Sequence, residues 1–93
     1  MEFLVQIKVL WPADGDPAQR DTLLAAERVR VADLCAEGRL RRLWRLPGRW
    51  ENVTLWDVDD ATELDELLRS LPLFPWLRIR VEALAKHPSD PAN

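Results

Sequence analysis

Glu27 is the acidic residue whose place in the sequence is least suited to a charge. At about 100° per residue, five apolar residues gather on its face of a helix: Leu23, Leu24, Val31, Leu34 and Cys35. Burying an unpaired carboxylate is costly or raises its pKa. A carboxyl group whose pKa lies nearer neutrality is suited to general-base catalysis. The spacing therefore makes Glu27 a candidate proton-transfer group.

Two other interpretations of Glu27 stand beside this one. The carboxylate could form an ion pair with an arginine, for which Arg20, Arg30 and the arginine-rich predicted strand 39–46 offer partners. Alternatively, the helix could be rotated so that the side chain lies at the rim of the apolar face. No other acidic residue lies so centrally in an apolar stripe, and this favours the catalytic interpretation.

A second group of candidates lies in an arginine-rich predicted strand, residues 39–46. Strict alternation puts Arg41 and Arg45 on one face, with Leu43 between them. Trp44 then points the other way, together with Leu40. An arginine beside an aromatic side chain can bind a small carboxylate through a forked, charge-assisted hydrogen bond. A solvated, charge-balanced sheet edge is the alternative interpretation.

Neutral hydrogen-bond donors are also present. The amide of Asn52 and the indole N–H groups of Trp44, Trp50 and Trp56 could stabilise an oxyanion. Buried tryptophans are, however, more often part of a core than of a catalytic site. His87, the only histidine, lies on a polar tail, where we expect it to be solvent-exposed unless it reaches a neighbouring subunit.

Composition narrows the possible cofactors, partners and locations. With one histidine and one cysteine, the chain has no metal-ligand spacing, and its three glycines form no phosphate-binding loop, so we expect no cofactor. A net charge of −3 argues against a nucleic-acid partner. The N-terminus lacks a basic region, and no apolar run approaches about 20 residues. These features predict a cytoplasmic protein without a membrane span.

Periodicity predicts the elements that must position these residues. Alternating apolar residues predict a strand over 3–11, and Asp16-Pro17 followed at a distance by Gly38 predicts a helix ending near residue 37. The remaining predicted elements are strands 39–46 and 50–58, a helix from Asp60, a strand 76–84 and a polar tail from about residue 86. The β-α-β-β-α-β order is that of an α+β, ferredoxin-like fold, in which two helices cover one face of a four-stranded antiparallel sheet. We expect one domain, residues 1–93.

The apolar content is high for such a short chain. Of the 93 residues, 47% are hydrophobic and five are tryptophan, while a domain of this size buries a limited share of its surface. The excess predicts a homo-oligomer in which two sheets pack face to face. A dense monomeric core is the alternative.

Several motifs together resemble the muconolactone Δ-isomerase family. The motifs are Asp16-Pro17-Ala18, Leu43-Trp44-Arg45 with Gly48 and Asn52, Asp57-Val58, Leu71-Pro72-Leu73-Phe74-Pro75, and His87-Pro88. The similarity runs from about residue 1 to residue 89 without an evident gap, and Glu27 lies in the matching first helix. Arg49-Trp50 departs from the His-Tyr pair expected there, and Trp11 is bulkier than usual.

The resemblance implies a dimeric α+β barrel, with dimers assembled into a decamer. It also implies a cofactor-free isomerase that converts muconolactone into 3-oxoadipate enol-lactone, in the catechol branch of the β-ketoadipate pathway. Within that activity Glu27 is the expected base. Asn52 or Trp44 is the expected oxyanion donor, and Arg45, then Arg41, is the expected partner of the substrate carboxylate.

If the pocket lies at a subunit interface, His87 of a neighbouring subunit could close it. Two alternative functions remain open at this stage. One is the isomerisation of a related, substituted lactone, for which the same base would serve. The other is a non-catalytic ligand-binding protein with the same fold, because Arg49 and Trp50 could fill the pocket.

Overall fold

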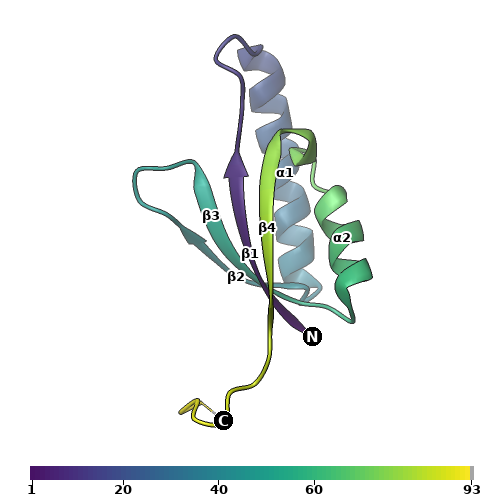
Figure 1. The fold of residues 1–93 in the computed structure, drawn as a ribbon. Coiled ribbons are helices and arrows are strands. Elements are labelled where there is room, and N and C mark those ends of the chain that lie inside the picture. The colour runs from purple at the N-terminus through teal and green to yellow at the C-terminus, as the bar shows by residue number, and fades with distance from the viewer. Residues whose placement is uncertain (93) are drawn as a thin grey trace.

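The computed structural model describes residues 1–92, so Asn93, the last residue of the predicted domain, lies outside the described residues. The elements in chain order are β1 (Glu2–Val9), α1 (Pro17–Ala36), β2 (Leu40–Arg45), β3 (Glu51–Asp57), α2 (Ala61–Arg69), η1 (Phe74–Trp76) and β4 (Leu77–Leu84). Figure 1 shows their arrangement. The predicted order of helices and strands is confirmed. The last strand begins one residue later than predicted because Trp76 belongs to a 3₁₀ turn.

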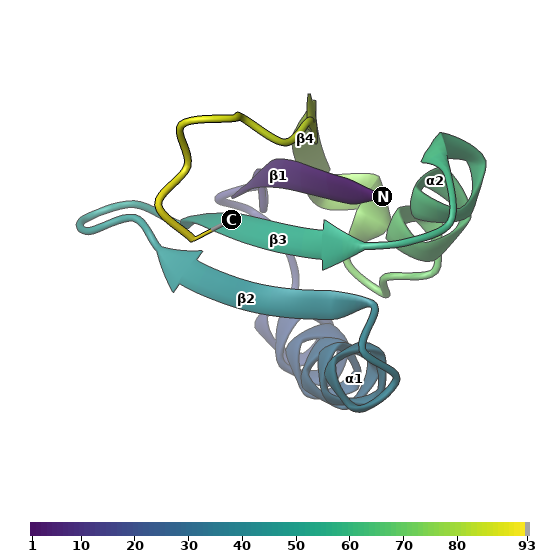
Figure 2. The ribbon, with the colours of Figure 1, turned by 90° about the horizontal axis from the view of Figure 1, so that it is seen from below.

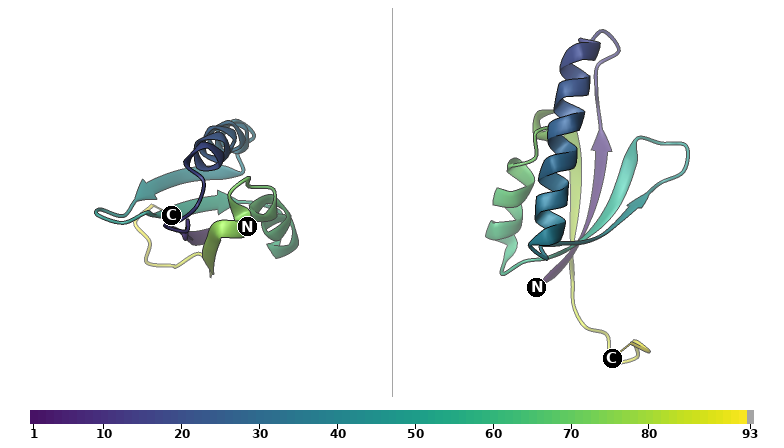
Figure 3. Two further views of the ribbon diagram at one scale, coloured as in Figure 1. Left: turned by 90° about the horizontal axis from the view of Figure 1, so that it is seen from above. Right: turned by 180° about the vertical axis from the view of Figure 1, so that it is seen from behind.

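The strands form one four-stranded antiparallel sheet in the order β2-β3-β1-β4. The central strand β1 pairs with β3 on one side and with β4 on the other. Both helices lie on the same side of the sheet, with α1 near β2 and α2 near the β1–β4 side (Figures 2 and 3). The predicted ferredoxin-like α+β arrangement is therefore confirmed.

The core lies between this face of the sheet and the helices. Alternate residues of β1 are buried, as their apolar character predicts: Phe3, Val5, Ile7 and Val9. They belong to one cluster with buried leucines of the helices, including Leu34, Leu64 and Leu68. Burying each such side chain stabilises the fold by about 1.5–3 kcal/mol. The sheet and the helices are thus held together by a continuous apolar layer.

The ends of the helices are fixed by capping residues. The side chain of Asp16 accepts a 3.0 Å hydrogen bond from the backbone N–H of Ala18 at the start of α1. Asp60 accepts a 2.8 Å bond from the N–H of Glu63 at the start of α2. Gly38 follows α1 with a positive φ of 76°, the left-handed conformation that favours glycine at a helix C-terminus. These caps determine where α1 begins and ends, and so where Glu27 lies along it.

One predicted alternation is wrong because β2 contains an irregularity. The register between β2 and β3 shifts between Leu40 and Arg42, so Arg41 is an extra residue in the strand. Leu40 is therefore buried on the helix side rather than facing outward with Trp44. Beyond the shift, Leu43 and Arg45 face the helix side, and Arg41 no longer shares their face. A bulge of this kind cannot be read from alternation alone.

The helical face predicted around Glu27 also needs one correction. Leu34 is fully buried, but Cys35 is exposed. Residue 35 lies near the edge of the predicted apolar face, and the last turn of α1 turns it toward solvent.

The C-terminal tail runs away from the body beyond the end of β4 (Figure 1). His87 lies on this tail; its Nδ1 accepts a 3.0 Å hydrogen bond from the N–H of Ser89, and its carbonyl accepts one from Asp90. Neither described helix is long and apolar enough to cross a membrane.

Candidate active site

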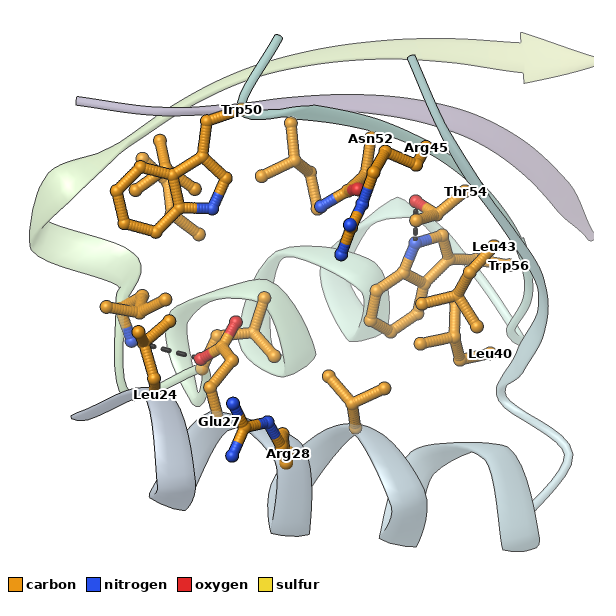
Figure 4. A pocket seen from close by; sticks show the side chains of 16 residues that line it. Leu24, Glu27, Arg28, Leu40, Leu43, Arg45, Trp50, Asn52, Thr54 and Trp56 are labelled. Atoms are coloured by element: carbon orange, nitrogen blue, oxygen red, sulfur yellow. Dashed lines mark hydrogen bonds between the residues drawn. The ribbon is translucent and has the colours of Figure 1, made fainter. Parts of the chain in front are cut away.

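A pocket of about 270 Å³ lies between α1 and the helix-facing side of the sheet (Figure 4). Its volume is just below the range of about 300–1,000 Å³ that is usual for small-molecule sites. The lining is largely aliphatic and aromatic. The polar residues among the lining are Glu27, Arg28, Arg45, Asn52 and Thr54. A few polar groups in an otherwise apolar cavity are typical of a site for a small organic molecule.

Glu27 enters this pocket from α1, on the same helical face as Leu24 and Val31. The backbone N–H of Leu73 donates a 3.1 Å hydrogen bond to its Oε1. No ion pair joins its carboxylate to an arginine within residues 1–92, which removes the ion-pair interpretation for that part of the chain. Burial raises the pKa of the Glu27 carboxyl, and the hydrogen bond from Leu73 opposes part of that rise.

Arg45 and Asn52 face Glu27 from the sheet. They are direct partners in the register of β2 and β3, so their side chains lie on the same face, and both line the pocket. In Figure 4 they project toward the space between the sheet and α1. No acidic residue within positions 1–92 forms an ion pair with Arg45. Its guanidinium group is thus available to an anionic ligand.

The indole N–H of Trp56 is already used by the protein. It donates a 2.8 Å hydrogen bond to Oγ1 of Thr54, whose hydroxyl donates a 2.9 Å bond to the carbonyl of Val5. Both side chains are buried. Trp56 is therefore a structural member of the pocket and is not available as the oxyanion donor considered from the sequence.

Three candidate residues lie outside the pocket of their own protomer. Arg41 pairs with Asp57, at 3.5 Å between Nη1 and Oδ2. Trp44 lies on the opposite face of the sheet, where the guanidinium of Arg42 stacks 4.9 Å from its ring centroid. His87 is on the tail and does not line the cavity. Among the candidates for base, carboxylate partner and amide donor, the structure thus brings together Glu27, Arg45 and Asn52.

Two groups of the pocket were not predicted from the sequence. Arg28 lies at its edge next to Glu27 in the chain. On a helical wheel it falls about 100° from the apolar face, so periodicity gave no reason to select it. The N–H of Leu73 was also missed because backbone groups carry no residue-type information. Its position after Pro72, in a turn, was the available clue.

Trp50 occupies the rim of the pocket, in the connection between β2 and β3. Its side chain is 44% exposed and yet lines the cavity. Gly48, in the same connection, has a φ of 74°, which allows the tight turn that brings Trp50 over the pocket. Trp50 is therefore placed to contact the outer part of a bound molecule.

The arrangement can perform proton transfer on a small anionic molecule. Glu27 is the only residue of the lining with a carboxyl, imidazole or thiol side chain. Arg45 can bind an anion, and Asn52 is a neutral donor on the side of the cavity opposite the base. Within residues 1–92, no three histidine, cysteine or acidic side chains gather as metal ligands would.

Comparison with known proteins gives one consistent family. Residues 1–90 match the family model described as muconolactone delta-isomerase. The chain is 40% identical over 88 residues to the muconolactone Delta-isomerase of Rhodococcus opacus, covering 95% of each protein. It is 42% identical over 90 residues to the enzyme of the same name from Cupriavidus pinatubonensis, covering 97% of this chain and 98% of that one.

The fold gives the same result. A crystal structure of muconolactone isomerase superposes with a TM-score of 0.92 at 40% sequence identity, covering 98% of this chain and 95% of that one.

Proposed function

The chain belongs to the muconolactone delta-isomerase family, and we propose that it shifts the ring double bond of muconolactone to give 3-oxoadipate enol-lactone. In this proposal residues 1–93 act as one domain that needs no cofactor, in the catechol branch of aromatic degradation. The observation that carries it is the placement of Glu27: a half-buried carboxylate, without an ion-pair partner among residues 1–92, in a largely apolar pocket.

The reaction needs one base and no redox partner. The carboxylate of Glu27 takes the proton from the ring carbon that bears the side chain. The C–H electrons form the new ring double bond, and the electrons of the old one move toward the lactone carbonyl, so that a dienolate forms with its charge on oxygen. The carbonyl then re-forms as the α-carbon takes the proton back from Glu27. Proton transfer by one carboxylate on one face of the ring completes the shift.

Arg45 and Asn52 supply the remaining functions. Arg45 binds the carboxylate of the substrate side chain, since its guanidinium is available on the sheet side of the pocket. Asn52 donates to the lactone oxygen as charge develops there. A well-placed base accelerates such a reaction by about 10²–10⁴-fold, and an oxyanion donor by about 10²–10³-fold. Binding and catalysis thus use different groups on opposite sides of the cavity.

The proposal includes a homo-oligomer built from dimers, a decamer as the family resemblance implies. Large apolar side chains remain exposed on the single chain, among them Leu43, Trp44, Val81 and Leu84 at 41–47%. The tail runs away from its own body, so His87 would close the pocket of a neighbouring protomer. Sedimentation-velocity analysis tests this: a monomer at micromolar concentration would contradict it. The expected cytoplasmic location is tested by fractionation of the source cells.

A second candidate substrate is a related lactone with a substituted ring. The observation that favours it is Trp50 at the rim, because a different aromatic surface there changes the shape available to ring substituents. The same base would serve, so the two candidates are separated by comparing kcat/KM for muconolactone and a methyl-substituted muconolactone.

Proton NMR of muconolactone in D₂O with the purified protein tests the activity itself. We expect the ring proton to disappear and the enol-lactone to appear at a rate proportional to enzyme concentration. A folded protein that produces neither conversion nor deuterium exchange would contradict the isomerase activity, for muconolactone and the substituted lactone alike.

A further inference from the structure

The segment between α2 and β4 contacts Glu27 through its backbone. The N–H of Leu73 donates to Oε1 of Glu27 at 3.1 Å, across 46 residues of sequence. In Figure 4 this bond joins one oxygen of the carboxylate to the chain beside the pocket, while the other oxygen points into the cavity. Oε2 accepts no hydrogen bond within residues 1–92. The two oxygens of the carboxylate therefore have different surroundings.

The turn that presents this N–H is firmly held. The N–H of Phe74 donates to the carbonyl of Leu71 at 2.9 Å, and the N–H of Trp76 donates to the carbonyl of Leu73 at 2.8 Å. Leu71 and Leu73 are 4% and 3% exposed, so their side chains anchor the turn in the core. Pro72 suits the second position of such a turn because its φ is already fixed.

The turn is also tied to the sheet. The N–H of Leu10, just after β1, donates to the carbonyl of Trp76 at 2.7 Å. The donor to Glu27 is thus fixed relative to the sheet that carries Arg45 and Asn52. A side chain on α1 is thereby held by a backbone group of the segment between α2 and β4, which lies beside it at the pocket.

We propose that the backbone N–H of Leu73 is the positioning group for Glu27: it holds Oε1, so that Oε2 is the oxygen that takes up and returns the proton. The inference rests on the proposed proton transfer by Glu27. A carboxylate fixed through one oxygen can present the other to both ring carbons without a change of side-chain rotamer. The N–H also stabilises the charged form of the carboxyl, which limits the rise in pKa that burial causes.

Replacing Leu73 by the α-hydroxy acid of leucine tests this role, because it changes only the N–H to an ester oxygen. Loss of a donor to a charged carboxylate raises its pKa, so the acid limb of kcat/KM should move up by about one pH unit. We expect kcat to fall about tenfold, with KM little changed. An acid limb and a kcat equal to those of the wild type would overturn the proposal.

The matched control is the corresponding ester at Phe74. The N–H of Phe74 belongs to the same turn but donates to Leu71, so this ester weakens the turn without touching Glu27. We expect it to leave the acid limb where it is in the wild type. If both esters moved the acid limb equally, Leu73 would act only through the stability of the turn, and the proposal would be wrong.

A pH titration of the protein with its natural backbone tests the positioning role independently of the esters. In ¹H–¹⁵N spectra, the amide proton of Leu73 should shift with pH at the midpoint given by the ¹³C resonance of the Glu27 carboxyl. The shift should vanish in Glu27→Gln. If the chemical shift of the Leu73 amide proton did not change as Glu27 titrates, the positioning role would be wrong even in an active enzyme. Absence of turnover with a coupled titration would instead overturn only the isomerase activity.

Discussion

Arg45 and Asn52 are paired directly across β2 and β3, and both side chains line the cavity that Glu27 enters from α1. A register shift earlier in β2 makes this possible, because it turns Arg41 away and brings Arg45 to the helix side. The cation and the amide are therefore adjacent on the sheet, and the base lies opposite them. A molecule held between them would have its carboxylate and its reacting ring in different parts of the pocket.

Arg45→Met should raise KM for muconolactone by about 10- to 100-fold, because one charge-assisted contact to the substrate carboxylate is lost. We expect a smaller change in kcat. Arg41→Met is the matched control: its side chain pairs with Asp57 outside the pocket, so KM should stay close to the wild-type value. Steady-state kinetics of the two variants measure both KM values. A larger rise in KM for Arg41→Met than for Arg45→Met would mean that Arg41, and not Arg45, binds the substrate carboxylate.

Asn52→Leu should lower kcat by about 10²–10³-fold with little change in KM, because the donor acts on charge that develops in the transition state. Trp44→Phe removes the other donor named from the sequence but keeps the ring. Trp44 lies on the outer face of the sheet, so this variant should retain nearly the wild-type kcat. If kcat instead fell in Trp44→Phe and stayed near the wild-type value in Asn52→Leu, Trp44 of a neighbouring protomer would supply the donor.

Thr54 connects the pocket to the stability of the fold. Thr54→Val removes the acceptor of the Trp56 indole N–H and leaves that buried donor unpaired, which costs about 1–3 kcal/mol. Thr54→Ser keeps the hydroxyl and should cost less. Urea unfolding at a fixed protomer concentration measures both. Equal losses for the two variants would show that the methyl group, rather than the hydroxyl, is the important part of Thr54.

Glu27 also predicts a dependence of stability on pH. Burial holds the pKa of its carboxyl in the folded state above the unfolded value, so the folded protein retains the proton more strongly. At a pH below the carboxyl pKa of the unfolded chain, Glu27 makes its full contribution to the free energy of unfolding. This contribution is lost as the pH rises through the carboxyl pKa of the folded protein.

In Glu27→Gln the side chain at this position has no titratable group. Its stability relative to the wild type should therefore increase as the pH rises above the unfolded glutamate pKa of about 4.3, measured by unfolding at one protomer concentration. A constant difference above that pH would contradict a raised pKa.

The fold could be predicted almost completely from local patterns. The alternating apolar residues of β1, the capping residues Asp16 and Asp60, and the glycine after α1 each determine one element by short-range chemistry. The order of those elements is then compatible with only a few sheet topologies. Within α1 one residue was assigned to the wrong side, since Cys35 is exposed in a position that the wheel assigns to the apolar face.

Glu27, Arg45 and Asn52 were named from the sequence and line the same pocket. Glu27 stood out because a charge in an apolar stripe needs an explanation. Arg41 was misplaced because a bulge inverts the alternation on which its assignment depended. Arg28 and the N–H of Leu73 carry no such conflict, and the contact of Leu73 with Glu27 joins segments that are far apart in the chain.

The most direct test of Glu27 as the base is the turnover of Glu27→Gln, which keeps the size of the side chain and an oxygen for the Leu73 N–H. Its circular dichroism and sedimentation should match the wild type, while kcat falls by about 10²–10⁴-fold. Glu27→Asp, which keeps the carboxylate but shortens its reach, should retain more activity than Glu27→Gln. A folded Glu27→Gln with more than about a tenth of the wild-type kcat would remove Glu27 from the role of base.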